Sequence, residues 1–192
     1  MNKKNISEKA THKKRIAIFA SGSGTNAENI ITYFQDSEVA EVVLVLSNKK
    51  DAKVLERAEK LNVDAVFFMK DELYSEEGIL RVLKELDTDL IVLAGFLLKF
   101  PELIIAEFPN RIINIHPALL PKYGGKGMYG SIVHEAVVKN KEQETGITIH
   151  FVNENYDEGT IISQKKVALS ELIHPKQWRK KSINWNMNGF RK

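Results

Sequence analysis

The stretch RIAIFASGSGTNAENIITYF, residues 15–34, decides the fold class. Residues 15–20 form an apolar run that predicts a strand, and the glycines at positions 22 and 24 predict a tight turn directly after it. The helix expected at residues 25–35 has apolar side chains at helical spacing, namely Ala27, Ile30, Ile31 and Phe34. A strand, a glycine turn and an amphipathic helix in this order are typical of the opening unit of an α/β domain.

The same alternation of strand and helix continues along the chain. Val42–Leu46 is apolar without interruption, which is typical of a strand buried on both faces of a parallel sheet. We therefore predict an α/β fold, a doubly wound and mostly parallel Rossmann-like sheet with an antiparallel extension near the C-terminus. Further strands are expected at residues 65–69, 90–94, 112–115, 147–152 and 161–167, and further helices at 52–61, 76–86, 101–108 and 131–139. Ligands of such sheets bind outside the carboxyl ends of the strands.

Composition excludes several classes of protein. A chain of 192 residues is expected to form one domain, and the lack of cysteine excludes a disulfide scaffold, a thiolate zinc site and a cysteine nucleophile. The longest uncharged apolar run, Leu90–Leu98, is far shorter than the ~20 residues that a membrane helix needs. Residues 1–15 show no apolar segment of the secretory-signal kind, so we expect a cytoplasmic protein without membrane association.

Positive charge is concentrated at the two ends of the chain. Residues 1–15 hold six basic side chains and one acidic one, and residues 172–192 hold six basic side chains and no acidic one. Residues 16–171 therefore carry 16 basic and 24 acidic side chains, although the formal net charge of the chain is +3. An acidic body argues against a nucleic-acid-binding protein. We divide the chain into a basic leader (1–14), one folded domain (15–170) and an atypical tail (171–192).

The glycine turn admits three roles. Residues 22–27, GSGTNA, fit the G-x-G-x-x-G/A pattern, whose glycines let a phosphate approach the N-terminus of the following helix. Dinucleotide binding also needs a carboxylate near the end of the second strand, where this chain has Ser47 and Asn48. The phosphate of a mononucleotide-like substrate therefore fits better than a dinucleotide. In the third role, a structural turn, Thr25 and Asn26 would only cap the helix.

A second polar group lies at the end of the predicted strand 112–115. Asn114 and His116 are two residues apart, so their side chains point to the same face of the strand, which Pro117 ends. The apolar flanks make an unpartnered polar pair costly, and the glycine-rich segment 121–130 beside it suits a mobile lid. The alternative interpretation is a purely structural pair at a strand end.

Further polar residues follow in the C-terminal half. Asp157 lies in the loop 153–159 between two predicted strands, where an aspartate before a glycine is also common in ordinary turns. His150 alternates with apolar neighbours, which predicts a buried supporting side chain, whereas His134 on its helix is expected to face solvent. We expect no metal, because no cluster of His, Asp or Glu has the spacing of a metal site.

Taken together, five motifs resemble the glycinamide ribonucleotide transformylase family, also called the phosphoribosylglycinamide formyltransferases, from about Arg15 to Leu169. No single motif is specific, but their order and spacing are. The motifs are SGSGTN (21–26), LSNK (46–49), LAGF (93–96), NIHPALLPKY (114–123) and TGITIHFV (145–152).

The resemblance implies a reaction of purine biosynthesis. A formyl group would pass from 10-formyltetrahydrofolate, the co-substrate, to the amine of glycinamide ribonucleotide, without a metal. The partners would be small molecules rather than nucleic acid or membrane, and the chain would be a monomer or a weak homodimer. Methionyl-tRNA formyltransferase and formyltetrahydrofolate hydrolase share the catalytic motifs but carry an additional domain.

The resemblance also implies the roles of individual residues. The catalytic residues would be Asn114, His116 and Asp157, with Asn114 and His116 donating hydrogen bonds to the oxyanion. Asp157 would raise the pKa of His116 and so favour the imidazolium. The nucleotide would be held by Gly24, Thr25 and Asn26. The folate pocket would be lined by Leu97, Leu98, Lys99, Phe100 and Asn114, with the loop 153–159 around the pterin.

After Leu169 the family pattern ends. Family members continue with an acidic helix start, whereas residues 173–192 contain no acidic residue and two tryptophans. A frameshift near residues 170–173 would explain this, because a family-like peptide read one nucleotide later yields the sequence of Ile173–Trp178. The altered tail leaves two alternatives open, an inactive or weakened nucleotide-binding remnant of the family and a dinucleotide-binding module.

Overall fold

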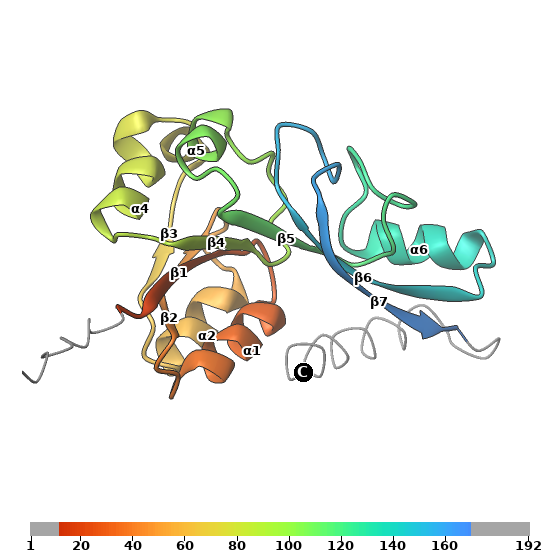
Figure 1. Ribbon diagram of the computed structural model, residues 1–192, viewed down its shortest axis with the longest axis horizontal. Coiled ribbons are helices and arrows are strands. Elements are labelled where there is room, and N and C mark those ends of the chain that lie inside the picture. Colours follow the sequence, from red (N-terminus) through yellow and green to blue (C-terminus); the bar gives the residue numbers. More distant parts are fainter. Residues whose placement is uncertain (1–11, 170–192) are drawn as a thin grey trace, which may run out of the picture.

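The computed structural model describes residues 12–169, which form one sheet covered by helices (Figure 1). Within these residues the sheet has seven strands in the order β3-β2-β1-β4-β5-β6-β7. The first five strands in this order are parallel, whereas β6 and β7 are antiparallel to their neighbours. The strands are β1 (Lys14–Phe19), β2 (Ala40–Ser47), β3 (Ala65–Phe67), β4 (Leu90–Leu93), β5 (Ile112–His116), β6 (Glu144–Phe151) and β7 (Ile161–Ala168). This arrangement confirms the predicted fold class.

The helices also follow the predicted pattern, with two differences. One short helix, α3, was not predicted, and the predicted helix 76–86 is divided into η1 and α4. The helical backbone is interrupted at Gly78, inside η1, where a Cβ atom would lie 2.0 Å from the carbonyl oxygen of Glu72. The helices are α1 (Thr25–Phe34), α2 (Lys53–Lys60), α3 (Lys70–Leu73), η1 (Glu76–Leu80), α4 (Arg81–Glu85), α5 (Glu102–Glu107) and α6 (Ser131–Lys139).

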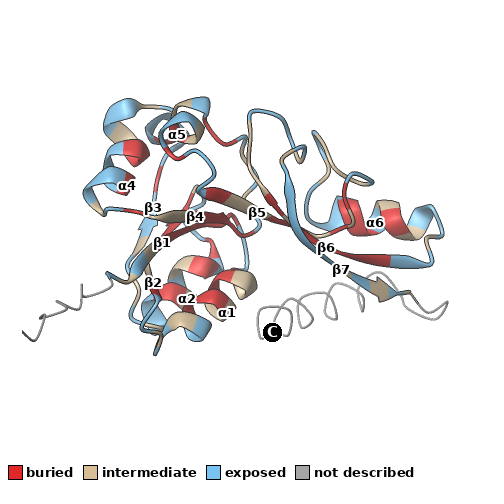
Figure 2. Ribbon diagram, viewed as in Figure 1, coloured by how far each residue is buried: buried red, intermediate tan, exposed pale blue. Residues whose placement is uncertain are grey.

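Two hydrophobic layers hold the helices on opposite faces of the parallel strands. Successive side chains of a strand alternate between faces, so Phe19 joins the layer under α4 and α5, whereas Ile18 joins the layer over α1 and α2. Both layers are continuous, which explains why the strands are apolar throughout (Figure 2). The parallel part of the sheet is therefore the rigid platform from which the loops at its carboxyl edge project.

The antiparallel strands carry the C-terminal half of the domain away from this platform. The register pairs Asn114 with His150 and His116 with Thr148, so β6 brings its side chains directly beside the end of β5. The loop between β6 and β7 then returns to the same edge of the sheet (Figure 1). β7 is mostly exposed within the described part of the chain (Figure 2).

Some predictions concern residues that the structure does not describe. Residues 1–11 of the predicted leader and the whole predicted tail, 171–192, lie outside the described residues. Among residues 12–169, no helix is long and apolar enough to cross a membrane. In the same range, no three His, Asp or Glu side chains come together as metal ligands would.

Candidate active site

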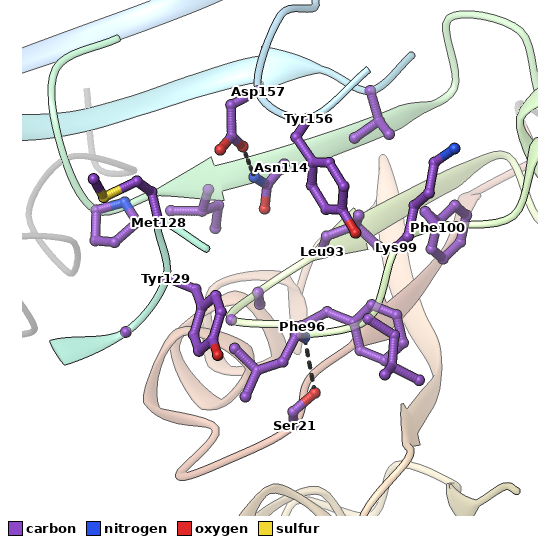
Figure 3. Close-up of a pocket in the computed structure, with 18 of the residues that line it drawn as sticks. Ser21, Leu93, Phe96, Lys99, Phe100, Asn114, Met128, Tyr129, Tyr156 and Asp157 are labelled. Atoms are coloured by element: carbon purple, nitrogen blue, oxygen red, sulfur yellow. Dashed lines mark hydrogen bonds between the residues drawn. The ribbon is translucent and has the colours of Figure 1, made fainter. Parts of the chain in front are cut away.

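A cavity of about 400 Å³ lies along the carboxyl edge of the parallel strands (Figure 3). One end is formed by the glycine turn at residues 22–26, and the other by Asn114 and Asp157. Between the two ends the segment 93–100, which begins at the last residue of β4, forms the wall. The cavity therefore joins the two polar groups that are separated by almost ninety positions in the chain.

The glycine turn depends on the conformation of Gly24. This residue is the N-cap of α1 and has a φ of 73°, in the left-handed region that favours glycine. A Cβ atom here would lie only 2.5 Å from the Cβ atom of Val54, at the start of α2. Thr25 and Asn26 are the first residues of α1, and no side-chain cap is present at its N-terminus. The helix therefore begins directly at the cavity, as phosphate binding requires.

Ser21 connects the glycine turn to the wall of the cavity. Its buried hydroxyl donates to Oδ1 of Asn48, 2.6 Å away, and accepts from the backbone N–H of Leu97 at 3.0 Å (Figure 3). Asn48 thus lies where a dinucleotide-binding protein would have its carboxylate, and its side chain is hydrogen-bonded to Ser21. One hydroxyl couples the ends of β1, β2 and β4.

The segment 97–100 is held by aromatic packing and lines the cavity throughout. The Phe100 ring packs edge-on against Phe19, with ring centroids 5.1 Å apart. Lys99 forms an ion pair with Glu102 at 3.0 Å, and its carbonyl accepts from the hydroxyl of Tyr74. The five residues predicted for the folate pocket all line the cavity: Leu97, Leu98, Lys99 and Phe100 in this segment, and Asn114 at the other end.

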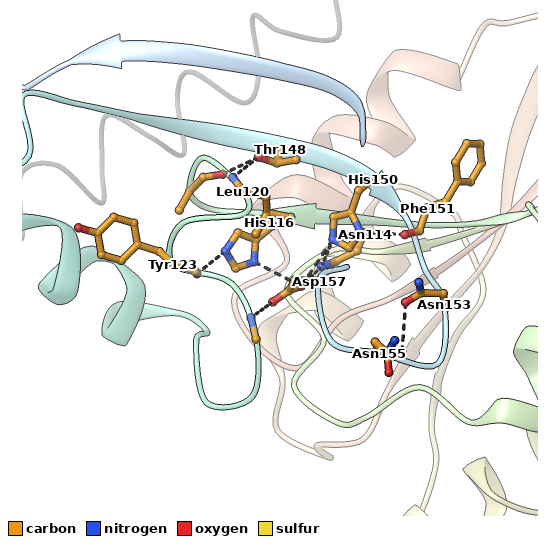
Figure 4. A network of polar contacts seen from close by, with 12 residues as sticks. Asn114, His116, Leu120, Tyr123, Thr148, His150, Phe151, Asn153, Asn155 and Asp157 are labelled. Carbon is orange, nitrogen blue, oxygen red and sulfur yellow. Dashed lines mark hydrogen bonds and ion pairs between the residues drawn. The ribbon is translucent and has the colours of Figure 1, made fainter. Parts of the chain in front are cut away.

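At the other end, Asn114, His150 and Asp157 form one network (Figure 4). The Nδ1 atom of His150 lies 2.8 Å from the carbonyl oxygen of Phe151, which can only accept, so Nδ1 carries the proton. In the neutral ring Nε2 is then an acceptor, and it receives one N–H of Asn114 at 3.1 Å. The second N–H of Asn114 is directed to Oδ1 of Asp157 at 3.3 Å. Both Nδ2 hydrogens are thus engaged, and the amide oxygen of Asn114 points away from Asp157 (Figure 3).

His116 lies behind Asp157 and does not itself line the cavity. Its Nε2 donates to the carbonyl oxygen of Tyr123 at 2.8 Å, and its Nδ1 lies 3.6 Å from Oδ1 of Asp157. Burial lowers the pKa of His116, and this effect exceeds the opposing influence of Asp157 and of the Tyr123 carbonyl. The predicted rise of this pKa is therefore wrong in its net direction, because the ring is only 3% exposed.

Asp157 is held at both carboxylate oxygens. Oδ1 faces Asn114 and the two histidines, whereas Oδ2 accepts the backbone N–H of Gly125 at 3.0 Å. Burial would raise the pKa of Asp157, but the two histidines, His150 and His116, which attract the carboxylate when they are protonated, and the Gly125 N–H together hold it below its usual value. Asp157 is therefore ionised at neutral pH.

Several residues at the cavity were not predicted. His134, expected to face solvent, is buried and lines the cavity, because α6 turns this side of the helix toward the sheet together with Val133 and Val137. Met128 and Tyr129 also line it, and their apolar side chains in a glycine-rich loop were a signal that could have identified them. Gly125 acts through its backbone N–H, for which a sequence carries no side-chain signal.

Comparisons with known proteins show the family to which the chain belongs. A family model described as formyl transferase matches residues 14–183. The chloroplastic phosphoribosylglycinamide formyltransferase of Arabidopsis thaliana is 38% identical over 178 residues, which cover 90% of this chain and 61% of that protein. The corresponding enzyme of Haemophilus influenzae is 38% identical over 161 residues, covering 82% of this chain and 74% of its own.

Among solved structures, glycinamide ribonucleotide transformylase 1 of Symbiobacterium toebii superposes with a TM-score of 0.83 at 30% identity. The match covers 93% of this chain and 84% of that one. The present chain spans about three fifths of the length of the Arabidopsis relative.

Proposed function

Because the chain belongs to the formyl transferase family, we propose that it transfers a formyl group from 10-formyltetrahydrofolate to the amine of glycinamide ribonucleotide. The observation that carries this proposal is the single cavity that joins the glycine turn to Asn114 and Asp157. A substrate with a phosphate at one end and a nucleophilic amine at the other fits between these two groups. Action in the cytoplasm, as a monomer or weak homodimer, stays a prediction.

The glycine turn suits the phosphate of the nucleotide. Gly24 lets the chain enter α1 without a side chain in the way, and the partial positive charge of the helix N-terminus favours an anion. Thr25 and Asn26, in the first turn of α1, line the cavity where the phosphate would bind. Lys49 also lines this end of the cavity and adds positive charge.

The middle of the cavity suits the folate. Leu97, Leu98 and Phe100 form an apolar wall for a flat ring system, and the loop 153–157 lies opposite with Asn153 and Asn155 as polar groups. When bound, 10-formyltetrahydrofolate supplies the formyl carbon, which the amine attacks while the bond to N10 breaks. The residues of the chain then have to stabilise the developing oxyanion and carry one proton.

Asn114 supplies the hydrogen bond to the oxyanion. Of its two N–H contacts, the one to Asp157 is the longer at 3.3 Å, and it is the one exchanged for the oxygen of the formyl group. The shorter contact to His150 holds the amide in place during this exchange. One such donor contributes about 3–4 kcal/mol to stabilising the transition state of acyl transfer.

Asp157 and His116 carry the proton as a pair. Neutral His116 keeps its lone pair on Nδ1, because Nε2 donates to Tyr123, and Nδ1 faces the carboxylate that lines the cavity. Imidazole is the more basic of the two groups, so a proton that Asp157 takes from the amine is held at Nδ1 of His116 and returns through Asp157 to the leaving nitrogen. Asp157 stabilises the transient imidazolium by its charge.

A transfer assay on the full chain tests this function. The chain is mixed with glycinamide ribonucleotide and 10-formyltetrahydrofolate, and the formylated nucleotide is measured by mass spectrometry. We expect product only when both substrates are present, and a chain restored to the family-like reading frame is the positive comparison. Formate release without a formylated nucleotide, or nucleotide binding without turnover in both chains, would contradict the proposal. A calorimetric titration with NAD tests the dinucleotide alternative.

A further inference from the structure

The short segment 123–125 binds both members of the proton-carrying pair through its main chain. The carbonyl oxygen of Tyr123 accepts from Nε2 of His116 at 2.8 Å, and the N–H of Gly125 donates to Oδ2 of Asp157 at 3.0 Å (Figure 4). The two bonds therefore hold Nε2 of His116 and Oδ2 of Asp157, which are the outer atoms of the pair. The inner atoms, Nδ1 and Oδ1, are left facing one another at 3.6 Å. We call this segment the 123–125 clamp.

The backbone of the clamp has an unusual conformation. Tyr123 has a φ of 62°, which a bulky side chain rarely adopts, and Gly125 has a φ of 95°. The chain also passes very close to Asp157, since a Cβ atom on Gly124 would lie 3.2 Å from that of Asp157 and 2.5 Å from the Leu120 side chain. A conformation of this kind persists only where surrounding contacts hold it.

Those contacts are made by the side chain of Tyr123. Its hydroxyl donates to Oε1 of Glu142 at 2.6 Å and accepts from Nδ2 of Asn140 at 2.9 Å. Lys122 forms an ion pair with the same Glu142 oxygen at 2.5 Å. Glu142 lies between α6 and β6, and neither it nor Tyr123 lines the cavity. The phenol therefore fixes the clamp to the turn between α6 and β6, outside the cavity.

We propose that Tyr123 and Glu142 are positioning residues for formyl transfer, which hold His116 and Asp157 in line through the 123–125 clamp. The reaction named here rests on the proposed function, but the alignment of the pair does not depend on which amine is formylated. The groups that face His116 are Asp157, His150 and the Tyr123 carbonyl, and Glu142 reaches His116 only through Tyr123.

The inference is tested with the full chain carrying Tyr123→Phe or Glu142→Ala. Both changes break the phenol–carboxylate bond, so we expect kcat to fall roughly 10- to 100-fold, as displaced catalytic groups do, while the KM values for both substrates stay unchanged. Glu142→Gln keeps a side-chain acceptor for the phenol and should restore most of the activity. Tyr33→Phe, which removes a phenol hydroxyl from the exposed side of α1, is the matched control and should have no effect.

A second measurement does not require turnover. The chain is labelled with ¹³C and ¹⁵N histidine, and His116 is identified by loss of its signals in His116→Gln. The Tyr123 carbonyl favours the protonated ring, so Tyr123→Phe and Glu142→Ala should lower the pKa of His116 further and let the neutral ring adopt both tautomers. A role limited to folding would lower the melting temperature without moving these signals.

Each outcome decides the proposal. Unchanged His116 signals in folded Tyr123→Phe and Glu142→Ala would overturn it, whatever happens to kcat. If Tyr123→Phe does not fold, the comparison of Glu142→Ala with Glu142→Gln carries the test, because Glu142 lies near the surface. If the wild-type chain transfers no formyl group but the His116 signals move as expected, the clamp is supported and the proposed function fails.

Discussion

The two ends of the cavity are built in opposite ways. The nucleotide end consists of consecutive residues, 22–26, and depends on the backbone conformation at Gly24. The transfer end is assembled from side chains and backbone groups of four separate segments, including Asn114 on β5, His150 on β6 and Asp157 in the loop after it. A substitution in the local backbone site should therefore weaken nucleotide binding. A substitution in the assembled network should instead lower kcat. Four predictions test this difference, from the largest expected effect to the smallest.

Asp157→Asn should give the largest effect. The neutral amide can neither stabilise protonated His116 nor take part in carrying the proton, so kcat should fall by about 10²–10⁴-fold. The KM for the nucleotide should change little, because its phosphate is held at the far end. Steady-state kinetics and circular dichroism check both points.

The neighbouring Glu158→Gln removes an exposed carboxylate and is the matched control. Turnover close to wild type in the Asp157→Asn variant would show that the transfer end does not depend on this network.

Gly24→Ala should damage the nucleotide end. The new Cβ would meet Val54 at 2.5 Å in a left-handed backbone, so we expect a loss of about 1–3 kcal/mol in the free energy of unfolding and a higher KM for the nucleotide. The KM for the folate should be much less affected. Thermal melts and kinetics with each substrate varied separately measure this.

Gly22→Ala is the control for the stability effect of this variant, since a Cβ atom at Gly22 has no heavy atom within 4 Å. If both alanine variants lose the same stability, the left-handed turn at Gly24 is not the cause of the loss.

As the pH falls, the transfer end should lose stability at a higher pH than the nucleotide end. Burial keeps the pKa of His116 below its usual value, so the folded chain disfavours protonation of this ring more than the unfolded chain does. Its contribution to stability is complete above about pH 6.5, the pKa of a free histidine, and is lost as the pH falls below it. Asp157, whose pKa is also lowered, loses its contribution only at more acidic pH.

Thermal melts from pH 8 to pH 5 at constant ionic strength follow this effect. The decline below pH 6.5 should be smaller in His116→Gln than in the wild type. If the melting temperature declines equally in His116→Gln and in the wild type, the loss of stability comes from another titratable group.

Ser21→Ala should give the smallest effect, spread over both ends. The hydroxyl links Asn48 to the N–H of Leu97, so its loss should cost about 1 kcal/mol of stability and raise both KM values slightly. Ser163→Ala, on the exposed strand β7 and outside the cavity, serves as the control. An effect on one KM alone would show that Ser21 belongs to one end rather than to the link between them.

Much of the nucleotide end could be predicted from the chain. The strand, the glycine turn and the helix at residues 15–34 are neighbours in sequence, and their periodicities are local properties of the backbone. The uninterrupted apolar run Val42–Leu46 likewise indicated a strand covered on both faces, and the structure confirms it as part of β2. The five motifs, by their order and spacing, indicated the family.

The transfer end depended on the folded arrangement. Asp157 contacts Asn114, although the two residues are 43 positions apart in the chain. The pairing of β5 with β6 places His150 beside Asn114. His134 is buried because its side of α6 packs toward the sheet, and Gly125 acts through a backbone N–H, which has no side-chain signal in the sequence. The pKa of His116 is the clearest case. Whether it rises or falls depends on the balance between burial and the charge of Asp157, and only the folded chain determines how large each effect is.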